Sequence, residues 1–223
     1  MKTQNSSSTP YGRLFATIGL MLLPVVAVSA DYQSTVLDDH PLAFYPINSD
    51  VDPTGTTATD LSGNGNNGTY NGTDPEYNTV PGPTAFIPNA LYFDGFTSYV
   101  DLSTGNNPAL LNFSGPITLE AWVQPGNPTQ SLGYILGKGY DNDNNGNELA
   151  LRVNGGHFES GSYNYSVGQK GASGGTPTMD WAYVVSTYDG TNWNMYVNGQ
   201  LVGQGADTVC ALNWTAPWAI GNG

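Results

Sequence analysis

An oxygen-rich segment, Asp141 to Glu148, has the residue types that bind a hard cation. The oxygen donors of interest are Asp141, Asp143, Asn145 and Glu148. Calcium accepts such ligands in irregular geometry. The spacing begins like an EF-hand loop, but Arg152 stands where that loop needs a bidentate glutamate, so an EF-hand is excluded. Two interpretations stay open: a calcium site of another kind, or a hydrated turn rich in Asn and Asp.

A second group of residues has the chemistry to hold a sugar. Tyr163, Asn164 and Tyr165 are consecutive in a Gly- and Ser-rich segment, and Tyr140 precedes the oxygen-rich loop. Exposed aromatic faces can stack on sugar rings, and amides can bond hydroxyl groups. Buried core packing is the commoner role of tryptophan in β sandwiches, and it is predicted for Trp122, Trp181 and Trp193.

Nucleophilic and zinc chemistry find little support in the sequence. The two histidines, His40 and His157, are far apart. His157 has no evident Ser or Asp partner for a catalytic triad. The composition also limits the partners. The formal charge is −13 with only five Lys and Arg, which disfavours nucleic acids and anionic membrane surfaces.

The N-terminus has the features of a secretory signal. Leu14–Val28 is an apolar run after Lys2 and Arg13, and Val28-Ser29-Ala30 matches a small-x-small cleavage pattern. We therefore expect residues 1–30 to be removed and the protein to be secreted or held at the cell surface. An uncleaved anchor is the alternative, but the run is shorter than the roughly 20 residues a spanning helix needs. The single cysteine, Cys210, excludes an internal disulfide.

The elements that must position these side chains are predicted to be strands. Between Trp181 and Gly203, Ala182–Tyr188 and Trp193–Val197 are rich in aromatic and β-branched residues. Asn198-Gly199 predicts a type I′ turn into a third strand, because both positions tolerate positive φ. Such a meander needs a second layer to cover its apolar face.

Other strands are predicted along the chain. Residues 117–124 alternate, with Ile117, Leu119, Ala121 and Val123 on one face. Further strands are expected at Leu42–Pro46, at Leu149–Val153 with His157–Phe158, and as a hairpin of Ala90–Gly95 with Ser98–Leu102. Pro75–Pro88 is expected to be a connector.

Several of these segments resemble, in order, a LamG-like jelly-roll domain of the concanavalin A-like lectin and glucanase superfamily. The matching segments are DLSGNGNNGTY (60–70), ALYFDGFTSYV (90–100), ITLEAWVQP (117–125), ILGKG (135–139), WAYVVSTYDG (181–190) and YVNGQLV (196–202). The resemblance implies an all-β, two-sheet antiparallel jelly-roll sandwich occupying residues 31–223. The family's closing strand has no counterpart after Ile220, so the domain is expected to be C-terminally incomplete.

The resemblance also implies roles for individual residues. LamG-like domains often hold a structural calcium at the segment that begins with Asp60, with Gly63 and Gly65 as carbonyl donors; a plain tight loop is the alternative. Retaining glucanases of the superfamily carry an E-x-D-x-E pair of carboxylates. Glu120 has Thr118 and Trp122 at the flanking positions, so it is predicted to be structural, paired with a backbone group or a base such as Lys138.

These observations favour an exported, noncatalytic binding module. Its predicted ligand is a carbohydrate or glycoconjugate, with calcium as an organiser of the loops. A structural or adhesion module that binds another protein is the alternative, and a glycoside hydrolase is a third class.

Overall fold

The computed structural model describes residues 32–48, 56–72, 79–103, 115–139, 148–164, 166–208 and 216–221. The predicted signal segment 1–30 and Cys210 lie outside these residues. The elements are α1 (Tyr32–Asp38), β1 (Thr57–Ala58), β2 (Gly68–Asn71), β3 (Thr79–Thr84), β4 (Ile87–Leu91), β5 (Tyr99–Asp101), β6 (Ile117–Val123), β7 (Gly133–Lys138), β8 (Glu148–Asn154), β9 (His157–Asn164), β10 (Gly168–Gly174), β11 (Ala182–Tyr188), β12 (Asn192–Val197), β13 (Gln200–Ala206) and β14 (Trp218–Ile220). Within the described chain, no helix has the length and apolarity needed to cross a membrane.

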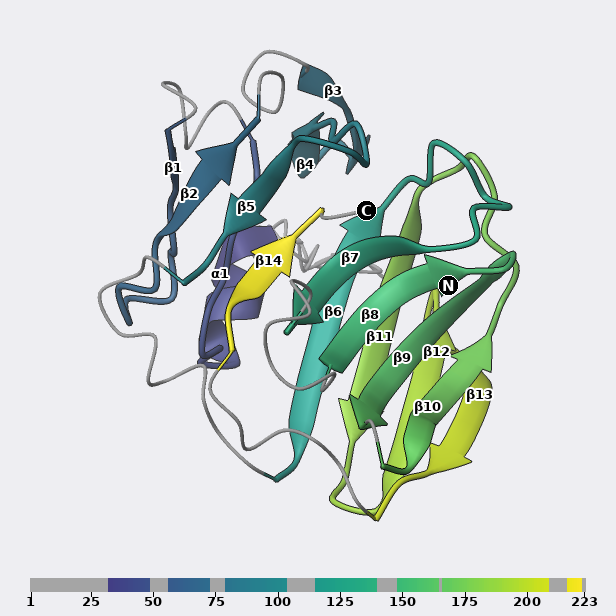
Figure 1. Ribbon diagram of the computed structural model, residues 1–223. Coiled ribbons are helices and arrows are strands. Elements are labelled where there is room, and N and C mark those ends of the chain that lie inside the picture. The colour runs from purple at the N-terminus through teal and green to yellow at the C-terminus, as the bar shows by residue number, and fades with distance from the viewer. Residues whose placement is uncertain are drawn as a thin grey trace, which may run out of the picture. The chain divides into compact units, whose positions relative to one another are not determined.

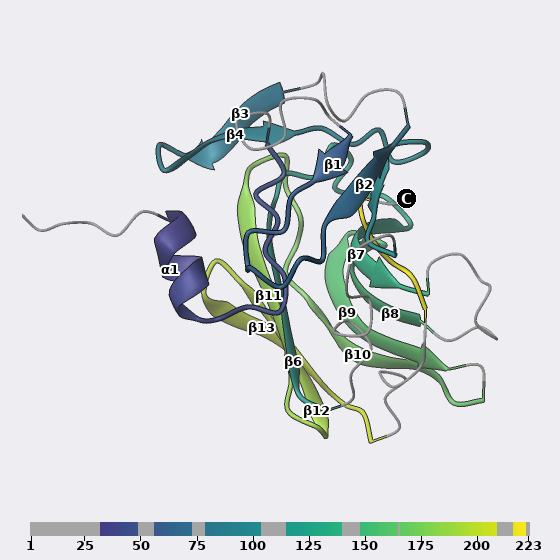
Figure 2. The same ribbon diagram turned by 90° about the vertical axis from the view of Figure 1, so that its left-hand side faces the viewer.

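The strands form two facing antiparallel sheets and a separate hairpin. One sheet has eight strands in the order β1-β2-β5-β14-β7-β8-β9-β10, and the other has four in the order β13-β12-β11-β6. Figure 1 shows β7–β10 lying in front of β6, β11 and β12, and Figure 2 shows the two layers from the side. This arrangement confirms the predicted all-β sandwich of jelly-roll type.

The predicted meander is confirmed as β11, β12 and β13. Buried and half-buried residues alternate along β11, as one covered face requires. Asn198 and Gly199 have φ of 50° and 78°, so both turn positions have the positive φ of a type I′ turn. The covering layer is the eight-stranded sheet, which contributes Leu149, Leu151 and Phe158 to the shared core.

Polar groups also link the two sheets inside the core. Ser160 of β9 bonds Ser186 of β11. The buried carboxylate of Asp207 accepts bonds from Ser162 Oγ at 2.7 Å and from Trp193 Nε1 at 3.0 Å. These bonds satisfy buried polar atoms that would otherwise destabilise the core.

Glycine residues allow close backbone contact at one side of the sandwich, where β10 of one sheet meets β13 of the other. A Cβ atom added to Gly203 would lie 2.3 Å from Ser173 O, and one added to Gly205 would lie 1.8 Å from Gly171 O. Only glycine permits this approach, because any side chain at these positions would overlap the facing strand.

The structure corrects the prediction of a first strand at Leu42–Pro46, which forms no strand. Its backbone bonds a loop instead of a neighbouring strand. Phe44 N donates to Asp60 Oδ1 at 3.0 Å, and Phe44 O accepts from Leu61 N at 2.9 Å. Because a carboxylate replaces a backbone acceptor, no ladder continues.

The expected hairpin of residues 90–95 with 98–102 is also wrong. β4 pairs with β3, and β3 lies inside the segment expected to be a connector. β5 pairs with β2 and β14. The Asp94 carboxylate accepts the backbone N–H groups of Phe96, Thr97 and Ser98, each at 2.9 Å. These bonds make a turn that directs the chain from the β3–β4 hairpin into the eight-stranded sheet.

Two of the three tryptophans predicted to be core residues lie elsewhere. Trp193 is fully buried, as predicted. Trp122 is half-buried on the outer face of β6, where its ring lies 5.2 Å from that of Tyr183. Trp181 is also half-buried and donates its indole N–H to Pro81 O at 3.2 Å. For Trp122 the strand alternation already pointed away from the core.

Candidate functional site

The structure describes six of the predicted site residues: Asp60, Gly63, Gly65, Glu148, Tyr163 and Asn164. Tyr140, Asp141, Asp143, Asn145 and Tyr165 lie outside the described residues.

Strand register brings Glu148 and Tyr163 together. Glu148 of β8 is directly opposite Tyr163 of β9, which is opposite Gln169 of β10. Along β8 the core takes Leu149, Leu151 and Val153, so Glu148 and Arg152 face outward. The outer face of β7–β10 therefore collects residues from both predicted sites.

Arg152 is the centre of this face. Its Nε donates to Glu159 at 2.7 Å, Nη1 donates to Glu148 and to Tyr134 Oη at 3.3 Å, and Nη2 donates to Gln169 Oε1 at 3.1 Å. Nη2 also forms an ion pair with Glu159. We call Tyr134, Glu148, Arg152, Glu159, Tyr163 and Gln169 the outer-face cluster.

Small residues between the clustered side chains make this network fit. Ala150 is opposite Gly161 in the ladder, between the Arg152–Glu159 pair and the Glu148–Tyr163 pair. A Cβ on Gly161, where φ is +151°, would lie 2.1 Å from Lys170 O, so glycine is needed there. Arg152 can therefore reach Glu148 and Gln169, because Ala150 and Gly161 between them have no large side chain.

The electrostatics hold these groups in place. Burial lowers the pKa of Arg152, but the charges of Glu148 and Glu159 outweigh it, and the net result is a raised pKa. Burial, together with the charge of Glu148, raises the pKa of Tyr134 to about 12. Within the cluster, Arg152 is thus a permanent cation and the Tyr134 phenol stays neutral beside it.

Oriented acceptors of this kind suit hydroxyl-rich ligands. Side chains of Glu148 and Glu159 keep 21% and 17% of their surface exposed, whereas Arg152 keeps 9%. The buried guanidinium orients the two carboxylates by hydrogen bonding, and their more exposed oxygens can accept hydroxyl hydrogen bonds. In a glycosidase the two carboxyl groups flank the scissile bond, whereas both carboxylates here are bonded to the guanidinium of Arg152.

Asn164 has a local structural role. Its Oδ1 accepts Ser166 N at 2.9 Å, and its backbone O accepts Val167 N at 3.1 Å. These bonds form the turn between β9 and β10. Asn164 therefore fixes the end of the strand on which Tyr163 lies.

The Asp60 loop is held by protein donors. Oδ1 of Asp60 accepts Phe44 N and Ser62 N at 3.0 and 2.9 Å, and Oδ2 accepts Asn66 N at 2.9 Å. Gly63 and Gly65 have φ of +86° and +74°, which gives the tight curvature expected there.

A calcium cage is not complete among the described residues of this loop. One buried acceptor, Asn66 Oδ1, has no partner in the described part of the chain, whereas calcium takes about six to eight oxygens. Within the same ranges, no group of three His, Cys, Asp or Glu side chains is close enough for a metal. N–H donors around Asp60 favour the tight-loop interpretation, and the calcium site stays a prediction.

Glu120 has a partner other than the one suggested by the sequence. Its Oε2 accepts a bond from Tyr183 Oη at 2.8 Å. Lys138 is 1% exposed, inside the core, with its Nζ 5.8 Å from the centre of the Trp218 ring. The suggested Glu120–Lys138 pair is therefore wrong, because β7 directs the lysine inward.

Sequence reasoning missed four members of the cluster: Tyr134, Arg152, Glu159 and Gln169. One signal was available for two of them. The turn at Asn154-Gly155-Gly156 places Arg152 opposite Glu159, and opposite charges across a ladder stabilise a strand pair.

Comparison with known proteins agrees with this fold. The model of the family described as "Concanavalin A-like lectin/glucanases superfamily" matches residues 94–223. Domain 4 of an extracellular GH43 arabinanase from Geobacillus stearothermophilus, solved with arabinotriose, is similar at 19% identity and a TM-score of 0.50, covering 81% of this chain and 84% of that one. The carbohydrate-binding module CBM66 from Bacillus subtilis is similar at 15% identity and a TM-score of 0.39, covering 70% and 86%.

No curated protein matches the sequence. The family model nevertheless covers more than half of the chain, and the two-sheet topology agrees with it. The chain belongs to the concanavalin A-like lectin/glucanases superfamily.

Proposed function

We propose that this protein is an exported, noncatalytic module that binds neutral glycans through the outer-face cluster. The observation that carries the proposal is the pair of partly exposed carboxylates, Glu148 and Glu159, held by Arg152 beside Tyr163. Carboxylate oxygens accept the hydroxyl bonds of a sugar, and an aromatic ring offers a face for its C–H groups.

Charge restricts the ligand class. The chain has a formal charge of −13, and the two carboxylates of the cluster exceed its single guanidinium. An acidic polysaccharide would be repelled, so a neutral one is favoured. The arabinanase domain that shares the fold was solved with arabinotriose, which makes that trisaccharide a sensible first probe.

Export is part of the same proposal. It is supported by the N-terminal signal pattern and by the extracellular setting named for the arabinanase. Cleavage after Ala30 is checked by N-terminal sequencing of the secreted protein.

Replacing Tyr163 with alanine is expected to weaken glycan binding about tenfold, which corresponds to roughly 1.4 kcal/mol. The reason is that the ring beside Glu148 supplies the apolar contact for the sugar. Isothermal titration calorimetry with arabinotriose, cellotriose and maltotriose measures the change. Tyr163→Phe should keep most of the affinity.

Tyr92→Ala is the matched control, because Tyr92 is 47% exposed and outside the cluster. Wild-type protein that binds no neutral glycan would disprove the proposal, as would equal losses for Tyr163→Ala and Tyr92→Ala.

We also propose that calcium binds the oxygen-rich segment that ends at Glu148. The Asp60 loop is a different part of the chain and is tested by its own substitution. Added calcium should then raise the melting temperature by mass action, and Asp141→Asn with Asp143→Asn should remove this rise. Asp60→Asn should lower stability to a similar extent with calcium and with EDTA, because Asp60 serves N–H donors. Scanning calorimetry with calcium or EDTA checks this, and a wild-type protein that does not respond contradicts it.

A further inference from the structure

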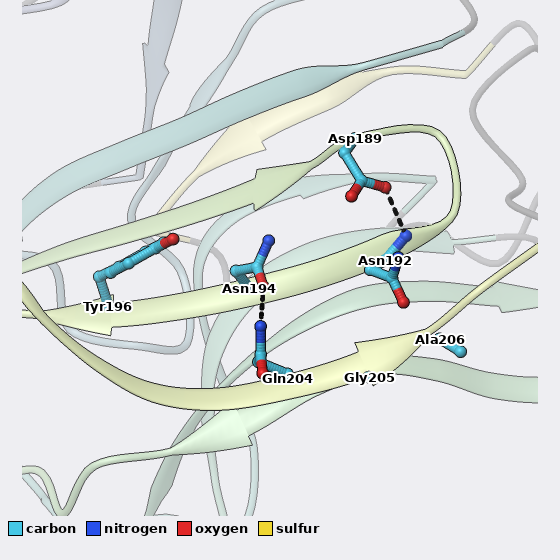
Figure 3. A pocket seen from close by; sticks show the side chains of 7 residues that line it. All are labelled: Asp189, Asn192, Asn194, Tyr196, Gln204, Gly205 and Ala206. Atoms are coloured by element: carbon cyan, nitrogen blue, oxygen red, sulfur yellow. Dashed lines mark hydrogen bonds between the residues drawn. The ribbon is translucent and has the colours of Figure 1, made fainter.

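A hollow of about 630 Å³ lies on the outer face of the four-stranded sheet, remote from the outer-face cluster. Its lining residues are Asp189, Asn192, Asn194, Tyr196, Gln204, Gly205 and Ala206. They come from β12, β13 and the turn that precedes β12 (Figure 3). The two outer faces belong to different sheets, so any ligand here is separate from one at the cluster.

A row of polar side chains crosses the strands at this hollow. Asn194 of β12 is opposite Gln204 of β13 and Thr187 of β11. Gln204 Nε2 donates to Asn194 Oδ1 at 2.7 Å, and Asn194 Nδ2 donates to Thr187 Oγ1 at 3.4 Å. Figure 3 shows the joined amides on the same face as Tyr196.

Asn194 lies within a strand although Asn is depleted at strand positions. Each amide can make more bonds than the ladder uses, since it has two donors and two acceptor lone pairs. The ladder fixes the orientation of both groups and leaves bonding capacity toward the solvent. Oriented, uncharged donors and acceptors suit sugar hydroxyls.

Two further residues complete the site. Tyr196 is half-buried on the same face of β12, two residues after Asn194, and offers an aromatic surface. Asp189 Oδ1 accepts Asn192 N and Thr191 N, each at 2.7 Å. These bonds lower the pKa of Asp189 to about 2 and fix its carboxylate at the end of the hollow.

We propose that this hollow is a second binding site for a neutral saccharide, with Asn194, Gln204 and Tyr196 as its contact residues. The inference rests on the proposed function for its ligand class, but on different residues of the opposite sheet. Amides and an aromatic ring without a basic group fit a neutral sugar and disfavour an acidic one. A domain with both sites can hold two glycan segments at once.

The test is titration of the full mature chain with arabinotriose, cellotriose and maltotriose, followed by backbone amide NMR. At about 10 mM sugar even a site with a millimolar Kd is mostly filled. We expect one of these sugars to shift two separate sets of resonances, one in β8–β10 and one in β12–β13. Tyr163→Ala should weaken the first set and leave the second in place.

Asn194→Ala combined with Gln204→Ala should weaken binding at β12–β13 at least about tenfold and leave the β8–β10 response unchanged. Gln200→Ala is the matched control, since Gln200 is an exposed glutamine at the start of the same strand. Unchanged dispersion of the spectrum shows that each variant is folded.

The outcomes separate the two proposals. Shifts confined to β8–β10, or β12–β13 shifts that survive the double substitution, overturn the second site and leave the proposed function standing. Shifts confined to β12–β13 support the second site and overturn the assignment of binding to the cluster. No shifts with any of the sugars overturn both.

Discussion

Trp193→Ala is expected to lower the free energy of unfolding by about 5 kcal/mol, enough to leave little folded protein. Trp193 is fully buried, and its ring stacks on Tyr188 with centroids 4.8 Å apart. Truncation removes this packing at a cost of roughly 3–5 kcal/mol. It also leaves the buried Asp207 carboxylate without its indole donor, which adds about 1–3 kcal/mol.

Urea unfolding followed by circular dichroism measures this loss. Trp193→Phe keeps a ring and removes the N–H donor, so we expect a smaller loss of about 2 kcal/mol. Trp181→Ala is the control at a half-buried position, with a loss under about 1 kcal/mol. A Trp193→Ala protein as stable as the Trp181→Ala protein would refute this account of the core.

Arg152→Met is expected both to destabilise the domain by about 3 kcal/mol and to abolish measurable glycan binding. The substitution leaves the carboxylates of Glu148 and Glu159 together, largely buried and without their cation. Repulsion then moves apart the groups that are proposed to contact the sugar. Urea unfolding and calorimetric titration measure the two effects.

A triple variant separates the two effects of Arg152. Adding Glu148→Gln and Glu159→Gln to Arg152→Met removes the unpaired charges, so most of the lost stability should return. Glycan affinity should stay low, because the carboxylates are themselves the proposed contacts. Recovery of both stability and affinity would show that the carboxylates only maintain the fold.

Local patterns made the four-stranded sheet predictable. Three of its strands are consecutive and joined by short turns, so composition, alternation and the Asn198-Gly199 pair were sufficient. Pairing between distant segments was not visible. The Leu42–Pro46 segment has the composition of a strand, yet its partner is a carboxylate 16 residues along the chain.

The same reasoning explains what was found of the candidate site. Tyr163 and Glu148 were identifiable from residue type, but their placement opposite one another depends on the register between β8 and β9. The Arg152 network spans four strands, and the small residues that make room for it have no chemistry to mark them. Asn194 and Gln204 were missed because single amides in a strand look like ordinary solvent-facing residues.

The close approach of β10 and β13 at Gly203 and Gly205 has a consequence for strand addition at the sheet edges. Strand margins are the usual places where another chain adds a β-strand and where aggregation starts. Since β10 and β13 cover each other's margins, the terminal strands left in the two described sheets are β1 and β6. β1 has only two residues, so β6, with seven, is the longer of these two terminal strands.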